Sequence, residues 1–215
     1  MTEVVVASVE MPERGVFLVR CPESFQWKDE IRGRRAVVAL DYGLDVGEVM
    51  SAGVYDPAVH GPRMPGFRLE RLLQDSDEAR LAENDGLAAE MREAFVKGMG
   101  PDAHEARVCS VRLSFGRTRL FLRVACDHRR QDFSRATAEV KRLFGVSVNV
   151  WQLGPRDEVA CVGALGVCGR VCCCASWQKR FPVRIAAPEG MNQAGANGVC
   201  GRYKCCWTFE QPQGE

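Results

Sequence analysis

The chain has 215 residues, 46% of them hydrophobic, and a formal net charge of +1. This length suits one large domain or two small ones, and the composition is that of an ordinary globular protein. No apolar run reaches the ~18 residues of a membrane span, and Met1 to Val4 do not begin a signal peptide. We therefore expect a cytoplasmic protein, in which clustered thiols more often bind metal or do redox chemistry than form disulfides.

Charge is distributed unevenly along the chain. Residues 1–106 hold 12 Lys and Arg against 20 Asp and Glu, whereas residues 107–215 hold 17 against 8. Such a split indicates either an anionic partner for the second half or a solvated basic surface that compensates an acidic one. The sequence leaves both alternatives open.

The first third of the chain has the pattern of β-strands. Short runs rich in β-branched residues occupy 4–7, 16–19 and 36–40, and a turn at 41–49 leads back into another strand. We expect a small N-terminal β unit over residues 1–58, strongly bent or barrel-like. A linker rich in proline and glycine then spans 56–66.

A helix is predicted from about Asp75 to Met99. Its apolar positions include Leu87, Met91 and Phe95, and glycines at 98 and 100 with Pro101 end it. We expect Gly86 to weaken this helix or to mark a break in it.

The segment after this helix predicts a β-β-α-β layer. Strands are expected at 108–115, 118–126 and 146–153, with a helix before the last strand that begins near Asp132 and stops at Gly145. The fold class is therefore α+β, with a central α+β domain over residues 67–155. Residues 156–215 form the third expected domain, an irregular Cys-rich module that binds a metal or a cluster.

An internal repeat marks this C-terminal module. Eight of the 11 cysteines lie between Cys161 and Cys206, and the pattern C-G-R-x-x-C-C occurs at 168–174 and again at 200–206. The segment has too few large apolar residues for a conventional core. We therefore expect the two motif loops to converge in space and to be held together by a shared bound group.

The residue types in the repeat suit a thiolate centre. A thiolate is the ligand form of cysteine, and a nearby Arg offsets its negative charge. A glycine between Cys and Arg allows positive φ, so that backbone amides can turn toward sulfur. The candidate metal ligands are Cys168, Cys173, Cys174, Cys200, Cys205 and Cys206, and the candidate supporting residues are Gly169, Arg170, Gly201 and Arg202.

The identity of the bound group stays open at this point. Soft, sulfur-only ligation suits an iron–sulfur cluster or zinc, and reduced thiols packed as small hydrophobic groups are a third alternative. Cys21, Cys109 and Cys126 are isolated and are interpreted as inert buried thiols. Each motif supplies three of the four cysteines that a closed site needs. Either both motifs contribute ligands to one site, or each motif requires a cysteine from a partner protein.

These motifs resemble those of the bacterial RicT/YaaT proteins of the PSP-one C-terminal homology family. The segment 153–158 before the first motif, the spacer at 181–186 and the closing Phe209-Glu210 are also similar. Cys161 and Cys172 do not match the family motif. The resemblance implies a non-enzymatic cytoplasmic adaptor that carries 4Fe–4S clusters together with the small proteins RicA and RicF. It also implies support of mRNA processing by RNase Y, and a role in sporulation, competence and biofilm formation.

Two other functions are compatible with the sequence. Residues 107–142 hold ten Lys and Arg against three Asp and Glu, with Phe115, Phe121 and Phe133 interleaved, a composition that suits RNA or DNA contact unless these rings face the core. A thiol-redox protein is the second rival. No recognisable hydrolase or transferase motif surrounds any of the three histidines.

Overall fold

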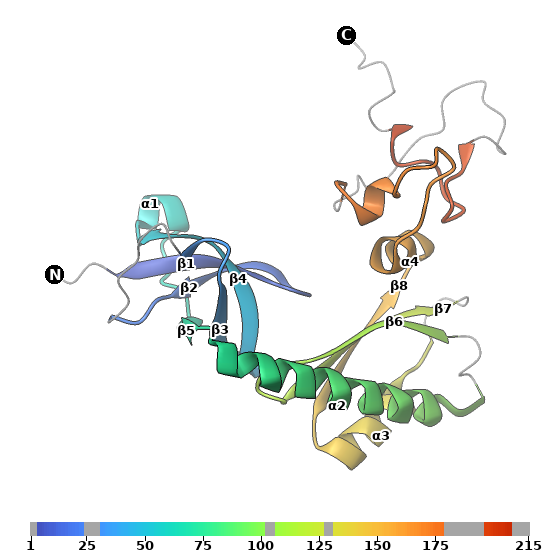
Figure 1. The fold of residues 1–215 in the computed structure, drawn as a ribbon, viewed down its shortest axis with the longest axis horizontal. Coiled ribbons are helices and arrows are strands. Elements are labelled where there is room, and N and C mark those ends of the chain that lie inside the picture. Colours follow the sequence, from blue (N-terminus) through green and yellow to red (C-terminus); the bar gives the residue numbers. More distant parts are fainter. Residues whose placement is uncertain (1–3, 24–30, 102–105, 127–130, 179–195, 208–215) are drawn as a thin grey trace, which may run out of the picture. The chain divides into compact units, whose positions relative to one another are not determined.

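The computed structural model describes residues 4–23, 31–101, 106–126, 131–178 and 196–207. The fold is α+β, as predicted: an N-terminal set of strands and a long helix precede a β-β-α-β segment, and a Cys-rich module follows (Figure 1). No helix among the described residues is long and apolar enough to cross a membrane.

The N-terminal strands close into a five-stranded barrel. They are β1 (Val5–Met11), β2 (Gly15–Arg20), β3 (Arg35–Leu40), β4 (Gly43–Val54) and β5 (Arg68–Leu72), in the spatial order β1-β2-β5-β3-β4. The long β4 pairs with β3 through its first half and with β1 through its second half. Alternate residues point inward and form the core, among them Ala7, Val9, Met11, Val38, Val49 and Leu69.

The barrel extends beyond the residues assigned to it from the sequence. The expected N-terminal unit ended at residue 58, but β5 comes from residues 68–72, which were assigned to the next domain. This strand pairs with β3 on one side and with β2, at Arg20 and Arg68, on the other. It therefore removes the two open edges that four strands alone would leave. The intervening segment contains a single helical turn, α1 (Pro57–His60).

Helix α2 spans Asp75–Met99, the range expected from its periodicity. Met91, Ala94 and Phe95 are buried, whereas Gly86 is exposed and does not interrupt the helix. The break suggested by Gly86 is therefore absent, because packing of the apolar face outweighs the low helix propensity of one glycine.

Two glycines in α2 lead to a paired prediction. A Cβ added at Gly86 would have no neighbour within 4 Å, whereas a Cβ at Gly98 would lie 2.8 Å from the Cα of Ala136. We expect Gly86→Ala to stabilise the protein by about 0.5–1 kcal/mol because alanine restricts the unfolded chain and favours the helix. Gly98→Ala should destabilise it. Urea unfolding of both variants tests this, and stabilisation by both would contradict the close approach at Gly98.

The second sheet has the predicted β-β-α-β connection. Its strands β6 (Ala106–Leu113), β7 (Arg119–Cys126) and β8 (Ser147–Leu153) lie in the order β6-β7-β8, and α3 (Ser134–Phe144) precedes β8. The carboxylate of Asp132 accepts hydrogen bonds from the amide and hydroxyl of Ser134, at 2.8 and 2.6 Å. Gly145 follows the helix with φ of 70°, as its position predicted.

A buried ionic network joins β4 to β6. Asp45 is fully buried and accepts hydrogen bonds of 2.8 and 2.9 Å from the two terminal nitrogens of Arg112. Arg112 also donates to Glu13, and the Tyr42 hydroxyl donates to Asp45 at 2.6 Å. Burial alone lowers the pKa of Arg112, but the hydrogen bonds to Asp45 and Glu13 outweigh it and raise the net pKa. The arginine therefore remains charged.

The chain divides into two compact units. One comprises residues 1–98, 112–121 and 136–149, and the other residues 99–111, 122–135 and 150–215. These bounds differ from the three segments expected from the sequence, because β6 and β7 each contribute residues to both units.

The second unit contains a helix that the sequence analysis missed. Residues after Gly154-Pro155 were interpreted as irregular, but α4 spans Pro155–Val162. Residues typical of helix ends are present in the sequence. Pro155 begins the helix, where an amide proton would have no partner within the helix, and Gly163 ends it with φ of 83°. Eight residues are too few for apolar periodicity to reveal it.

Candidate metal centre

Each copy of the repeat folds into a small turn, which we call a knuckle: the first comprises residues 164–174 and the second residues 196–206. An antiparallel bridge joins Leu165 to Val171 in the first knuckle and Asn197 to Tyr203 in the second. The Gly166 amide donates to Arg170 at 2.7 Å, and the Gly198 amide donates to Arg202 at 2.8 Å. The two knuckles therefore share one backbone conformation, offset by 32 residues (Leu165 to Asn197).

A glycine in the left-handed region closes each knuckle. Gly169 has φ of 74° and Gly201 has φ of 72°, and each amide donates a 2.9 Å hydrogen bond to the glycine three residues earlier. A residue with a Cβ is strained in this conformation, which explains the glycine of C-G-R.

The structural repeat is longer than the motif found in the sequence. The Cys172 amide donates to Ala164 at 2.9 Å, and the Lys204 amide donates to Ala196 at 3.1 Å. Written from these alanines, both knuckles follow A-x-G-V-C-G-R-x-x-C-C. Extending the sequence alignment by four residues toward the N-terminus would have found this.

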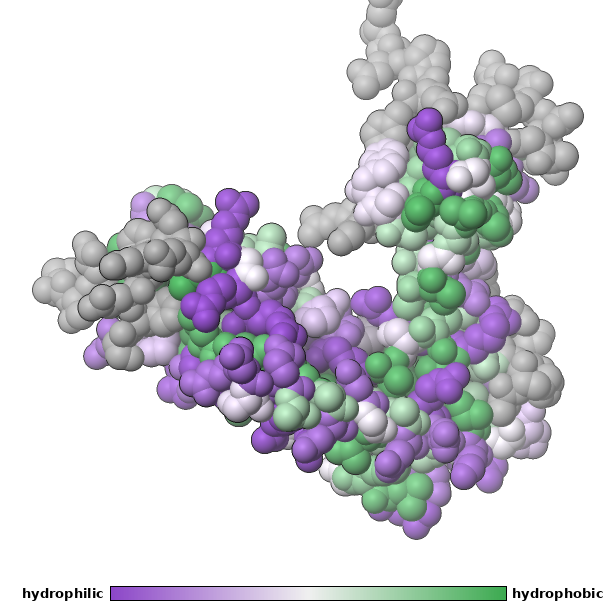
Figure 2. All heavy atoms as spheres, viewed as in Figure 1, coloured by the Kyte–Doolittle hydropathy of each residue, from purple (hydrophilic) through white to green (hydrophobic). Residues whose placement is uncertain are grey.

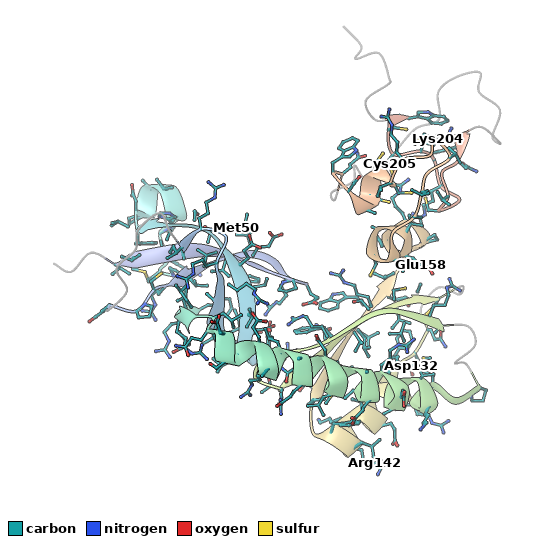
Figure 3. All side chains as sticks on the ribbon, viewed as in Figure 1. Met50, Asp132, Arg142, Glu158, Lys204 and Cys205 are labelled. Carbon is teal, nitrogen blue, oxygen red and sulfur yellow. The ribbon has the colours of Figure 1, made fainter. Side chains whose placement is uncertain are left out.

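The two knuckles line one cavity of about 280 Å³, so the predicted convergence of the motif loops is confirmed. Figure 3 shows this module, with Lys204 and Cys205 labelled on the second knuckle. A single water needs only ~10–15 Å³, so the cavity has room for a larger group. Its lining contains seven cysteines: Cys168, Cys172, Cys173, Cys174, Cys200, Cys205 and Cys206.

Six of these cysteines are the candidate ligands from the sequence, and Cys172 is the seventh. Cys172 was set aside because it does not match the family motif, yet it lines the cavity, whereas Cys161 is not part of the lining. The second knuckle has Lys204 at the position equivalent to Cys172, and its ammonium lies 5.7 Å from the centre of the Trp207 ring. The otherwise duplicated site is thus asymmetric at this one position.

Three of the cavity thiols have raised pKa values. Burial, together with the charge of Cys205, raises the pKa of Cys174 to about 11. Burial also raises the pKa of Cys172 and of Cys205. A metal must therefore displace protons from these thiols when it binds.

The arginine that acts on these thiols is Arg156, on α4. One terminal nitrogen donates a 2.9 Å hydrogen bond to the Tyr203 carbonyl, and its charge partly offsets the burial that raises the pKa of Cys205. Arg170 and Arg202, the arginines singled out from the motif, are exposed. No local pattern distinguishes Arg156 from the other arginines, because its contact is with a residue 47 positions away.

We expect Arg156→Gln to weaken metal retention more than Arg170→Gln does. The first change removes a positive charge near Cys205 and the hydrogen bond that holds the second knuckle on α4, a bond worth about 1.5–3 kcal/mol when the donor is charged. Zinc affinity of each isolated chain, from competition with a chromophoric chelator and compared with the wild type, measures the effect. Equal retention by both variants would contradict the supporting role of Arg156.

Sulfur chemistry and geometry together define what the cavity can hold. Soft thiolates suit zinc or an iron–sulfur cluster, and no histidine occurs in the lining. Across the described residues, no group of three or more Cys, His, Asp or Glu side chains is already arranged to hold a metal ion. The donor set therefore fits such a group, although these thiols are not already arranged as its ligands.

The fold and the cavity thus define a class: an α+β protein with a barrel and a paired-knuckle, cysteine-lined site. Over 157 residues, 73% of this chain, it is 26% identical to Stage 0 sporulation protein YaaT from Bacillus subtilis (strain 168). The match covers 56% of that protein, so the chain spans about half the length of this relative. The similarity supports the YaaT-like part of the predicted resemblance, and the PSP-one assignment stays a prediction. No family model and no solved structure matches the chain.

Proposed function

We propose that this protein is a non-enzymatic regulatory adaptor of the YaaT type whose two knuckles hold one thiolate-ligated centre. The observation that carries the proposal is the set of seven cysteines, contributed by two knuckles of the same conformation, around one cavity. The similarity to a sporulation protein favours a regulatory role. When bound, the group supplies a structural link between the knuckles, as metals do in small domains without a sufficient core.

We favour a 4Fe–4S cluster, with zinc as the alternative. The seven lining cysteines exceed the four that either group needs. Because these cysteines are not prearranged as ligands, we expect the isolated chain to hold the centre weakly.

A protein partner would stabilise the centre by binding to this module. Large hydrophobic side chains are exposed on this module, namely Val162, Leu165, Val167, Val171, Trp177 and Val199, and Figure 2 shows hydrophobic surface there. An exposed apolar patch of this kind is typical of a protein-binding surface. By the family resemblance, the proposed partners are small RicA- and RicF-like proteins, acting with an endoribonuclease of the RNase Y type.

The test is purification of the full chain without oxygen, alone and with candidate partners, followed by metal analysis and visible absorbance. We expect little bound metal in the chain alone, and a brown, iron- and sulfide-containing complex after mixing. A colourless complex with zinc would select the alternative. Absence of metal from the chain and from every complex would refute the centre.

Direct nucleic-acid binding is the weaker candidate. Phe115 and Phe121 are 4% and 1% exposed, so two of the three rings proposed for base stacking face the core. Several basic groups of this region are also engaged in ion pairs, Arg112 with Asp45 and Arg142 with Glu139 among them. A thiol-redox role for the cavity has less support still, because no C-x-x-C pair occurs among its cysteines.

A further inference from the structure

Two cysteines outside the knuckles lie close in sequence to an ion pair that joins α4 to β6. They are Cys109 on β6 and Cys161 on α4, and both are partly accessible free thiols. The two elements are joined by an ion pair: the Arg107 guanidinium donates to the two carboxylate oxygens of Glu158, at 2.8 and 3.2 Å. Figure 3 labels Glu158 on the helix.

Because of this ion pair, Cys109 and Cys161 lie on the faces of β6 and α4 that are joined by it. Arg107 and Cys109 are two residues apart on a strand, so their side chains leave the same face. Glu158 and Cys161 are three residues apart on a helix, so they also share a face. The charge of Cys161 is among the causes that raise the pKa of Cys109, after burial and Glu158, which agrees with this proximity.

We propose that Cys109 and Cys161 form a dithiol site that peroxide oxidises reversibly to a disulfide. Peroxide converts one thiol to a sulfenic acid by transfer of one oxygen, with loss of one water. The second thiol then attacks that sulfur, an S–S bond forms and a second water leaves. The two cysteines lose two electrons and two protons in all, and one peroxide gives two waters. A small dithiol reverses the reaction by exchange.

The disulfide would act on α4, which positions both knuckles. Arg156 of this helix holds the second knuckle through Tyr203, and the first knuckle begins directly after the helix ends at Gly163. Oxidation would fix α4 on the sheet without consuming any cysteine that lines the cavity. This inference does not depend on the identity of the group bound there.

The test is disulfide mapping of the reduced full chain after treatment with one equivalent of hydrogen peroxide and alkylation of the remaining thiols. Trypsin places Cys109 in peptide 108–112 and Cys161 in peptide 157–170, which also contains Cys168. We expect these two peptides to be linked in the wild type and in Cys168→Ser. The linked pair should fall more than tenfold in Cys161→Ser and in Cys109→Ser, and should disappear after dithiothreitol treatment.

Two results would overturn the proposal. One is Cys109 recovered fully alkylated while the cavity cysteines carry the disulfides. The other is a link from Cys109 that survives in Cys161→Ser, which would identify Cys168 or Cys126 as its partner. Circular dichroism of each serine variant before oxidation shows whether the variant is folded. A lost disulfide is then attributed to the missing thiol and not to unfolding.

Discussion

Asp45→Ala is expected to destabilise the first unit by about 3–5 kcal/mol, because it removes one of the two carboxylates that pair with Arg112 and leaves buried hydrogen-bond donors without an acceptor. Asp45 is fully buried, and besides Arg112 it accepts hydrogen bonds from the Tyr42 hydroxyl at 2.6 Å and the Val46 amide at 3.0 Å. Arg112 keeps its pair with Glu13 in this variant, so the loss combines one broken ion pair with the unsatisfied Tyr42 and Val46 donors. Equilibrium unfolding in urea, followed by far-ultraviolet circular dichroism, measures it.

Asp41→Ala is the matched control for this variant. Asp41 also pairs with an arginine, Arg14, at 2.6 Å, but its side chain is 53% exposed. Exposed ion pairs of this kind contribute about 0–1 kcal/mol. A comparable loss in both variants would show that burial of the Asp45 network has no special effect on stability.

Zinc affinity of the isolated chain should fall steeply as the pH is lowered from 8 to 6. Burial raises the pKa of Cys172, Cys174 and Cys205, so these thiols carry protons throughout this range in the metal-free chain. Each thiol that must lose its proton to bind the metal contributes about a tenfold fall in affinity per pH unit. Two such thiols therefore give about a hundredfold change per unit, with the tighter binding at the higher pH.

Competition with a chromophoric zinc chelator at pH 6, 7 and 8 checks this dependence. The raised pKa has the opposite consequence for the metal-free fold. Burial favours the protonated Cys174 thiol in the folded state. This contribution to the free energy of unfolding is complete at neutral pH, and it is lost only as the pH rises through about 11, the pKa of Cys174. An affinity that does not change between pH 6 and 8 would indicate that the buried thiols are not ligands.

Local sequence signals predicted most of the elements in the fold. The range of α2, the cap at Asp132 and the stop at Gly145 follow from apolar spacing and from residues with particular backbone preferences, and both act within a few residues. The closure of the barrel by β5 did not follow from such signals. Pairing of β5 with β3 joins Ala36 to Leu72, and a contact so distant in sequence leaves no local periodicity.

The same distinction applies to the candidate site. The repeat indicated which thiols belong together, and the glycines predicted the positive φ at each turn. Cys172 and Arg156 were not expected in the site. Cys172 lines the cavity between the two knuckles, and Arg156 reaches it through its hydrogen bond to Tyr203, so both positions depend on tertiary packing. Side chains that support a site through tertiary contacts have no spacing rule of their own.

The most direct test of the paired-knuckle centre is the amount of Co²⁺ bound per chain, from thiolate–cobalt absorbance in an oxygen-free titration of the full chain. The wild type is compared with Cys168→Ser, Cys200→Ser and the control Cys21→Ser, whose side chain packs against the barrel core. If both knuckles serve one centre, each of the first two variants loses nearly all of the wild-type absorbance, while the control keeps it. Retention of about half the wild-type absorbance in both Cys168→Ser and Cys200→Ser would contradict a shared centre and indicate two independent sites.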